Sequence, residues 1–195
     1  MSTQDILSFA MCLFNEVQLL DYSGPMDLIG FLSKTSLENP NVPKFFTTPP
    51  KVEFEFEYLA PSKEPIRPTS GPDILPTMTY DEVLASGKQF NVFLVPGGEY
   101  LSATTVYPRH TKGFRTTGWG SAPDNTPDEL KRFIKAQFPG AKYVLSVCTG
   151  SWALAQAGAI DGRRATTNKS TFRAVVVRLH VFLLMEHTSH MINSN

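Results

Sequence analysis

The chain has 195 residues, of which 42% are hydrophobic and 18% charged, a globular composition that fits one domain over residues 1–195. Eighteen basic residues balance eighteen acidic ones, so no excess charge favours nucleic acid or an anionic membrane as partner. We therefore expect a small-molecule ligand. The N-terminus lacks the basic region of a signal peptide, and no apolar run reaches the roughly 20 residues of a membrane span, so we expect a cytoplasmic protein.

The first elements along the chain are a predicted strand and a predicted helix. Residues 6–14 are almost wholly apolar, which is typical of a central strand covered on both faces. The segment 22–34 offers Ser23 or Gly24 as a cap and Pro25 near the first helical position, which predicts a helix within it.

The middle of the chain predicts two further strands and a short helix. Residues 51–60 alternate between apolar side chains and glutamates, which indicates a strand with one solvent-exposed face. Residues 60–79 hold five prolines and should form an ordered loop with short extended pieces. A short helix over residues 79–87 is then followed by the apolar run 90–95, and the sequence Pro-Gly-Gly ends that strand.

The last elements repeat the alternation of helix and strand. Residues 126–129, Thr-Pro-Asp-Glu, match a capping box and predict the start of a helix. Residues 141–147 predict a strand, residues 151–158 a helix that ends at a glycine, and residues 163–167 another short strand. Strands that alternate with helices in this way favour a parallel sheet covered on both sides.

One of the two cysteines lies at a junction between a strand and a helix. Ligands of such sheets bind beyond the carboxyl ends of the strands, where residues 14–21, 95–98 and 147–150 could meet. Cys148 occupies a sharp turn that can expose its side chain, and the following helix start favours thiolate over thiol. The alternative is that Cys148 is a small buried residue that closes the strand. Cys12, inside an apolar run, should simply pack in the core. We expect both thiols to be reduced.

Three stretches together resemble the ThiJ/PfpI superfamily: "FNEVQLLDYSGPMDLIG", "FLVPGG" and "YVLSVCTGSWALAQAGAIDGRRATTNK". The chain is most similar to the isonitrile-hydratase-like branch and related fungal-type members, which carry Cys-Thr-Gly at the turn. The resemblance implies a flavodoxin-like, doubly wound, mostly parallel sheet of the class I glutamine amidotransferase type. It also implies a homodimer. The glycine patterns of a Rossmann fold and of a P-loop are absent from the sequence, so no nucleotide cofactor is expected, and no metal site is expected either.

The resemblance also implies roles for individual residues. Cys148 would be the catalytic nucleophile and Asp21 its acidic partner. The backbone amide of Thr149, together with that of Gly98, would stabilise negative charge that develops on the substrate. The glycines implied to line the oxyanion and substrate site are Gly97, Gly98 and Gly150. From the residues alone, the favoured interpretation of Asp21 is a turn residue, and the Gly97–Gly98 pair can equally be no more than a tight turn.

The chain also departs from the family pattern. Thr149 stands where protease-like members have a histidine, and Asn168 stands where many isonitrile-hydratase-like members have one. Residues 99–123 look like an insertion, which we expect to be a solvated loop, and residues 175–195 do not look like family sequence. A sheet left incomplete at the C-terminus would expose apolar surface, so low solubility or tight self-association is expected.

Three functions remain open on these grounds. The first is a cysteine-dependent enzyme of the hydratase, lyase or hydrolase type that acts on a small electrophilic molecule. The second is a redox-sensing or protective protein whose Cys148 is oxidised reversibly. The third is an inactive, truncated relative. Replacement of Asp21 separates the first two, because only an enzyme would lose turnover.

Overall fold

The computed structural model describes residues 5–41, 50–98, 126–167 and 192–193. Its sheet has the strand order β3-β2-β1-β4-β5-β6. The strands are β1 (Asp5–Cys12), β2 (Val52–Ala60), β3 (Met78–Thr79), β4 (Val92–Val95), β5 (Tyr143–Ser146) and β6 (Ile192–Asn193). The first five pair in parallel and β6 is antiparallel to β5, which confirms the prediction of a mostly parallel sheet.

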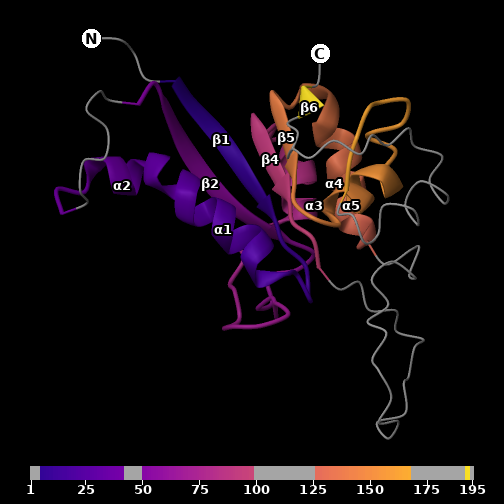
Figure 1. Cartoon of the computed structure of the whole chain (residues 1–195), viewed down its shortest axis with the longest axis horizontal. Helices are drawn as coiled ribbons and strands as arrows, with labels where there is room; N and C mark the ends of the chain where they lie inside the picture. The colour runs from indigo at the N-terminus through magenta and orange to yellow at the C-terminus, as the bar shows by residue number, and fades with distance from the viewer. Residues whose placement is uncertain (1–4, 42–49, 99–125, 168–191, 194–195) are drawn as a thin grey trace, which may run out of the picture.

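Helices cover both faces of this sheet (Figure 1). They are α1 (Leu19–Ile29), η1 (Gly30–Leu32), α2 (Lys34–Glu38), α3 (Tyr80–Ser86), α4 (Asp128–Gln137), η2 (Phe138–Gly140) and α5 (Gly150–Gln156). Helices α1 and α2 lie over β1 and β2, while α3, α4 and α5 lie on the other side. None of the helices in the described ranges is long and apolar enough to cross a membrane.

The strand order places a topological switch point between β1 and β4. From β1 the chain first adds β2 and β3 on one side, and then β4 and β5 on the other. The connections that leave β1 and β4 therefore diverge at the carboxyl ends of these two strands. In open parallel sheets this divergence leaves the crevice where ligands bind.

The core is built on β1 and β4. The alternating pattern of β2 places Phe54 and Phe56 beside Phe9 of β1, with ring centroids 5.6 and 5.2 Å apart. On the other side of the sheet, Phe133 of α4 packs edge-on against Phe93 of β4 at 5.7 Å. Cys12 is fully buried in this core, which confirms the prediction that its thiol is a packing group.

Helix α1 begins earlier than the sequence predicted. It starts at Leu19, so Pro25 lies inside the helix instead of at its first position. The Ser23 hydroxyl does not cap the helix but donates to the Leu19 carbonyl at 2.8 Å. The early start has a cause in the fold, because the amide of Gln18 donates to the Gly97 carbonyl at 2.9 Å and fixes the chain just before the helix. Asp21 consequently lies in the first turn of α1.

Two other local predictions are wrong. The capping box at residues 126–129 does not form: Pro127 is the N-cap of α4, and the buried Thr126 hydroxyl finds no partner among the described residues. Residues 163–167 contribute only the bridge position Ala165 instead of a strand. Past the Gly162 turn, with φ 70°, the Thr167 hydroxyl donates to the Cys148 carbonyl, so this segment supports the turn at Cys148.

The expected insertion, residues 99–123, and most of the tail, residues 175–195, lie outside the described residues.

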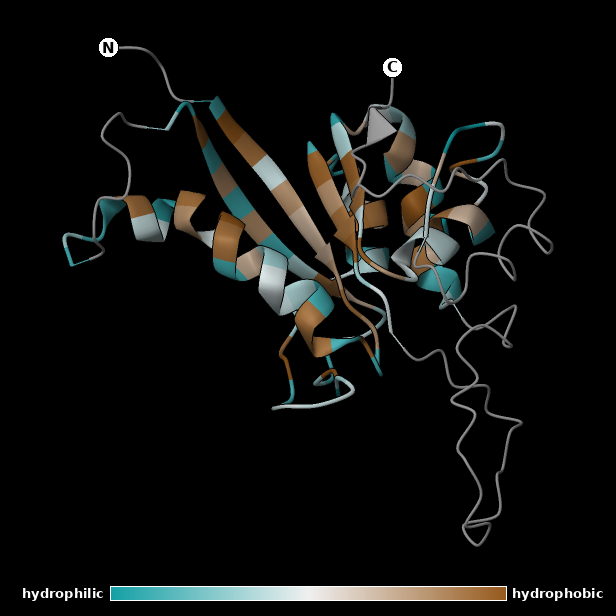
Figure 2. Cartoon of the chain, viewed as in Figure 1, coloured by the Kyte–Doolittle hydropathy of each residue, from teal (hydrophilic) through white to brown (hydrophobic). Residues whose placement is uncertain are grey.

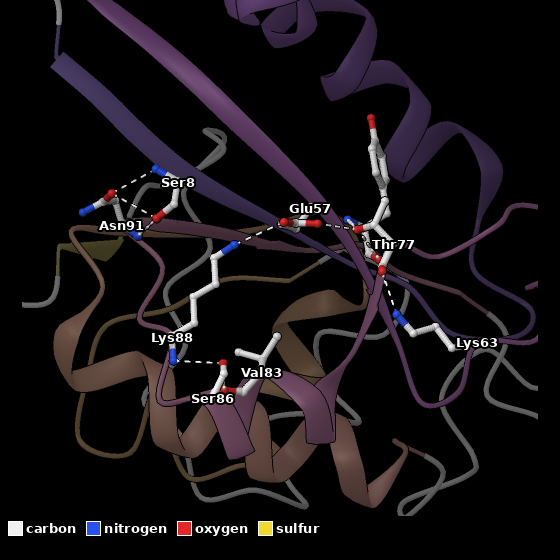
Figure 3. A network of polar contacts seen from close by, with 9 residues as sticks. Ser8, Glu57, Lys63, Thr77, Val83, Ser86, Lys88 and Asn91 are labelled. Atoms are coloured by element: carbon white, nitrogen blue, oxygen red, sulfur yellow. Dashed lines mark hydrogen bonds and ion pairs between the residues drawn. The ribbon is translucent and has the colours of Figure 1, made fainter.

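A polar network joins β2 to the chain that leads into β4 (Figure 3). The Glu57 carboxylate accepts hydrogen bonds from the Thr77 hydroxyl at 2.6 Å and from the Lys88 ammonium at 3.1 Å. Burial raises the pKa of Glu57, but these two bonds and the charges of Lys88 and Lys63 together lower it below its ordinary value. The ionised carboxylate therefore stabilises the folded chain.

Replacing Lys88 by Met should lower the free energy of unfolding by about 0.5 kcal/mol near neutral pH, the size expected for a partly exposed ion pair. Because the pKa of Glu57 is lowered in the folded state, its contribution is present above the ordinary pKa of 4.5 and is lost as the pH falls through the folded value. Urea unfolding of wild type, Lys88→Met, Glu57→Gln and the double variant at neutral pH and at about pH 3 measures the coupling. A coupling energy that does not change with pH would contradict this assignment.

Candidate active site at the carboxyl ends of β1, β4 and β5

Three segments that are distant in the sequence meet at the switch point. Asp21 comes from the first turn of α1, Gly97 and Gly98 follow β4, and Cys148 and Thr149 lie between β5 and α5. The Gly97 amide donates to Asp21 Oδ2 at 3.1 Å, and the Gly98 amide donates to Thr149 Oγ1 at 3.3 Å. The structure thus brings these predicted site residues into one place.

Gly97 is in contact distance of all three side chains. A Cβ atom built on it would lie 2.6 Å from Asp21 Oδ2, 2.8 Å from Thr149 Oγ1 and 2.9 Å from the Cβ of Cys148. Real Cβ atoms do not approach other atoms so closely, so only glycine lets the carboxyl, the hydroxyl and the thiol-bearing carbon gather around this turn. The requirement for Gly97 is therefore steric.

Cys148 occupies a strained backbone position. Its φ is 54°, in the left-handed region that side chains other than glycine rarely adopt. The hydroxyls of Ser151 and Thr167 both donate to its carbonyl, at 3.2 and 3.3 Å. The sequence analysis did not predict these two hydrogen bonds. The serine three residues after the cysteine was a usable signal, because a side chain at that spacing in the first helical turn can reach the cysteine carbonyl. The thiol-bearing residue is half-buried, in contrast to the fully buried Cys12.

Asp21 is held in a form that resists ionisation. Burial raises the pKa of its carboxyl above the ordinary value of 3.8, and hydrogen bonds from the Gly97 amide and with the Cys148 thiol oppose part of that rise. A carboxyl poised in this way can accept and return a proton closer to neutral pH than an exposed aspartate can. Because this carboxyl is hydrogen-bonded to the Cys148 thiol, it can exchange that proton with the sulfur atom.

The glycines implied as oxyanion donors are already engaged. The Gly97 amide is bonded to Asp21 and the Gly98 amide to Thr149, the second bond being long at 3.3 Å. A substrate oxyanion at Gly98 would therefore have to displace the Thr149 hydroxyl. Gly150 has a steric role, because a side chain there would run into the Val95 carbonyl oxygen at the end of β4. The binding roles of these residues stay predictions.

A second strained residue precedes the site. Glu16, in the turn between β1 and α1, has φ 64°. Its amide donates to the Arg67 carbonyl at 2.7 Å, and its own carbonyl oxygen lies 2.5 Å from the position that a Cβ atom on Gly98 would take. These contacts fix the left-handed conformation, which no local sequence pattern predicts at a glutamate.

Glu16→Gly should therefore stabilise the chain relative to Glu16→Ala by about 1 kcal/mol, since glycine adopts this conformation without the clash of a Cβ atom. The two variants lose the same carboxylate, so their difference isolates the backbone. Urea unfolding of both measures it. Equal stability of the glycine and alanine variants would show that the turn is not strained.

Other residues singled out by the sequence lie outside the described ranges. They are Asn168 and the basic residues of the expected insertion, Arg109, His110, Lys112 and Arg115. The prediction that the site needs no metal or cofactor also stays a prediction.

Comparisons with known proteins show similarity to the DJ-1/ThiJ/PfpI superfamily. The family model described as "DJ-1/PfpI family" matches residues 117–182, which include Cys148 and α5. The chain is 29% identical over 162 residues to isonitrile hydratase from Pseudomonas putida, covering 83% of this chain and 52% of that protein.

Solved structures show the same fold. A ThiJ/PfpI family protein from Pseudomonas syringae aligns with a TM-score of 0.55 and 23% identity, over 85% of this chain and 51% of the other. DJ-1beta from Drosophila melanogaster aligns with a TM-score of 0.60 and 14% identity, over 99% of this chain and 82% of the other. The chain spans about half the length of the Pseudomonas relatives that it matches.

Proposed function

From the confirmed resemblance of this chain to the DJ-1/ThiJ/PfpI superfamily, we propose that it is a cysteine-dependent enzyme acting on a small electrophilic molecule, with hydration of an isonitrile as the first reaction to test. The observation that carries the proposal is the cluster of Asp21, Gly97 and Cys148, in which a half-buried carboxyl with a raised pKa bonds to the cysteine side chain. Hydrolase and lyase reactions of other small electrophiles are the related possibilities.

The chemistry follows from the two side chains. The Cys148 thiol passes its proton to the Asp21 carboxylate, and Sγ bonds to the terminal carbon of the isonitrile. That carbon takes the proton back from Asp21, which gives a thioimidate, R–N=CH–S–Cys148. Water then adds to the same carbon, with one of its protons going to nitrogen. The C–S bond breaks, sulfur recovers a proton, and an N-substituted formamide leaves.

The surrounding groups would orient these steps. The Gly97 amide fixes Asp21 Oδ2 beside sulfur, so the proton has a short path. The Thr149 hydroxyl accepts from the Gly98 amide, which leaves its own hydrogen for a second acceptor. We propose that this acceptor is the incoming water or the substrate.

The experiment is an assay of the purified chain with an aliphatic isonitrile, with glyoxal and with a small amide. Formation of the N-substituted formamide is followed by chromatography for wild type, Cys148→Ser and Asp21→Ala. We expect product from wild type and none above background from either variant. Turnover by Cys148→Ser at the wild-type rate would refute the nucleophile.

The sensor alternative is separated by the same proteins. If wild type turns over no compound, yet hydrogen peroxide oxidises Cys148 and a thiol reductant restores it, the enzyme proposal is wrong and the redox-sensing function replaces it. In that case Asp21→Ala should change the oxidation rate without abolishing the reaction.

We also propose that the chain forms a homodimer through α1. No residue of α1 is buried within the described structure. Leu20 and Leu28 are 70% and 77% exposed, and with Gly24 between them they follow the four-residue spacing of one helix face. Figure 2 shows the hydrophobic segments along this outer helix. A second copy packed on this face would cover them.

Leu28→Glu should shift the chain from dimer to monomer, because it places a charge in the proposed interface. Leu75→Glu is the matched control, since Leu75 is similarly exposed at 71% but lies in the loop before β3. Sedimentation equilibrium of the three proteins decides the question. A monomeric wild type, or a dimer that survives Leu28→Glu, would exclude α1 as the interface.

The cytoplasmic location stays a prediction.

A further inference from the structure

Residues 66–74 form a strap that is closed on itself. Ile66 and Ile74 exchange both backbone hydrogen bonds, at 2.8 and 2.9 Å, and the Arg67 guanidinium pairs with Asp73 at 3.0 Å. Ile66 is buried in the core, so one end of the strap is anchored to the body of the fold. The sequence predicts an ordered loop with short extended pieces over residues 60–79, and the bridge between Ile66 and Ile74 is such a piece.

The strap holds the turn of residues 15–18 from the outside. Two of its contacts come from side chains: Asn15 Oδ1 accepts from the Arg67 amide at 2.9 Å, and the Thr69 hydroxyl donates to Gln18 Oε1 at 3.3 Å. Backbone bonds run beside them, from the Glu16 amide to the Arg67 carbonyl and from the Thr69 amide to the Val17 carbonyl. The strained turn is thus braced along its whole length.

The inner side of the same turn contacts the site. The Gln18 amide donates to the Gly97 carbonyl at 2.9 Å, and Val17 forms an antiparallel bridge with Gly98. Gly97 in turn donates to Asp21, and Gly98 to Thr149. A continuous series of hydrogen bonds therefore joins the strap to the carboxyl and hydroxyl that flank Cys148.

We propose that residues 66–74 act as a positioning strap for the candidate active site, and that Asn15 and Thr69 are its positioning residues. By bracing the 15–18 turn, the strap sets where the Gly97–Gly98 turn lies and so fixes the Asp21 carboxyl against the Cys148 thiol. Neither Asn15 nor Thr69 touches the reacting groups. The inference deepens the proposed function and rests on Cys148 and Asp21 being its reacting pair.

The experiment measures the reactivity of the Cys148 thiol, so it needs no substrate. The double variant Asn15→Ala, Thr69→Val removes both side-chain bonds, and its matched control Asn15→Asp, Thr69→Ser keeps an acceptor at one position and a hydroxyl at the other. The rate of Cys148 alkylation by iodoacetamide is followed by peptide mass spectrometry across the pH range. Thermal unfolding is recorded for each protein.

We expect the alkylation rate of the Ala/Val variant to change by roughly threefold or more from wild type, with a shifted inflection in its pH profile. The Asp/Ser control should follow wild type. The pH profile of the alkylation rate is informative because a loss of packing alone would lower the unfolding temperature but would not shift the inflection of that profile.

An unchanged rate and profile in the Ala/Val variant would overturn the proposal, whatever its unfolding temperature. An equal change in the Asp/Ser control would overturn it too, because the hydrogen bonds would then not be the cause. If the Ala/Val variant does not fold, Thr69→Val against Thr69→Ser gives the same comparison. Absence of turnover in the substrate assay would refute the proposed function but would not change these labelling rates.

Discussion

Asp21→Asn should lower turnover by about a hundredfold or more while making the chain more stable near neutral pH. The activity falls because an amide can keep the bond from the Gly97 amide but cannot carry the proton between sulfur and substrate. The stability rises because burial disfavours the ionised carboxylate. For a half-buried group the gain should be about 0.5–1 kcal/mol.

The pH dependence fixes the sign of this effect. The pKa of Asp21 is raised in the folded state, so its favourable contribution is complete below the ordinary value of 3.8 and is lost as the pH rises through the folded value. The stability advantage of Asp21→Asn should therefore be small in acid and grow towards neutral pH. Urea unfolding at several pH values measures it, and an advantage that is absent near neutral pH would contradict the burial of this carboxyl.

Gly150→Ala should destabilise the chain by about 3 kcal/mol or more. The new methyl group would meet the Val95 carbonyl oxygen and lie 3.0 Å from the Pro96 carbonyl oxygen. Both are backbone atoms at the end of β4, so relief of the clash requires β4 and α5 to move apart. The expected fall in the unfolding temperature is roughly 6 °C or more.

Gly30→Ala is the matched control for that substitution. Gly30 has φ −59° at the end of α1, and a Cβ atom there meets nothing within 4 Å. This change should be neutral or stabilise the chain by up to about 1 kcal/mol. Thermal unfolding of both variants separates the clash from the general effect of replacing glycine, and a Gly150→Ala protein as stable as Gly30→Ala would show that α5 is not packed as described.

The predictions that held depend on short-range patterns. Residues 79–87 fold as expected, because the Thr79 and Glu82 capping box and the left-handed Gly87 are encoded within one short segment. The place of Cys148 between a strand and a helix is likewise encoded by an apolar run followed by helix-forming residues.

What could not be predicted depends on contacts between distant segments. The early start of α1 arises from the bond between Gln18 and Gly97, almost eighty residues apart in the chain. The left-handed Glu16 is fixed by Arg67, and the Cys148 carbonyl is supported by Thr167. At Thr126 the local pattern was present but the structure does not follow it. The sequence matches a capping box, yet the Thr126 hydroxyl caps no helix.

The two cysteines provide the most direct measurement of the central assignment. Native protein is treated with iodoacetamide, and the modification of each cysteine is followed by peptide mass spectrometry. Because Cys148 is half-buried at the crevice and Cys12 is fully buried in the core, we predict that Cys148 reacts at least about a hundredfold faster, and that Cys12 reacts only when the chain unfolds. Equal rates, or a Cys148 that stays unmodified in the folded protein, would contradict its assignment as the nucleophile.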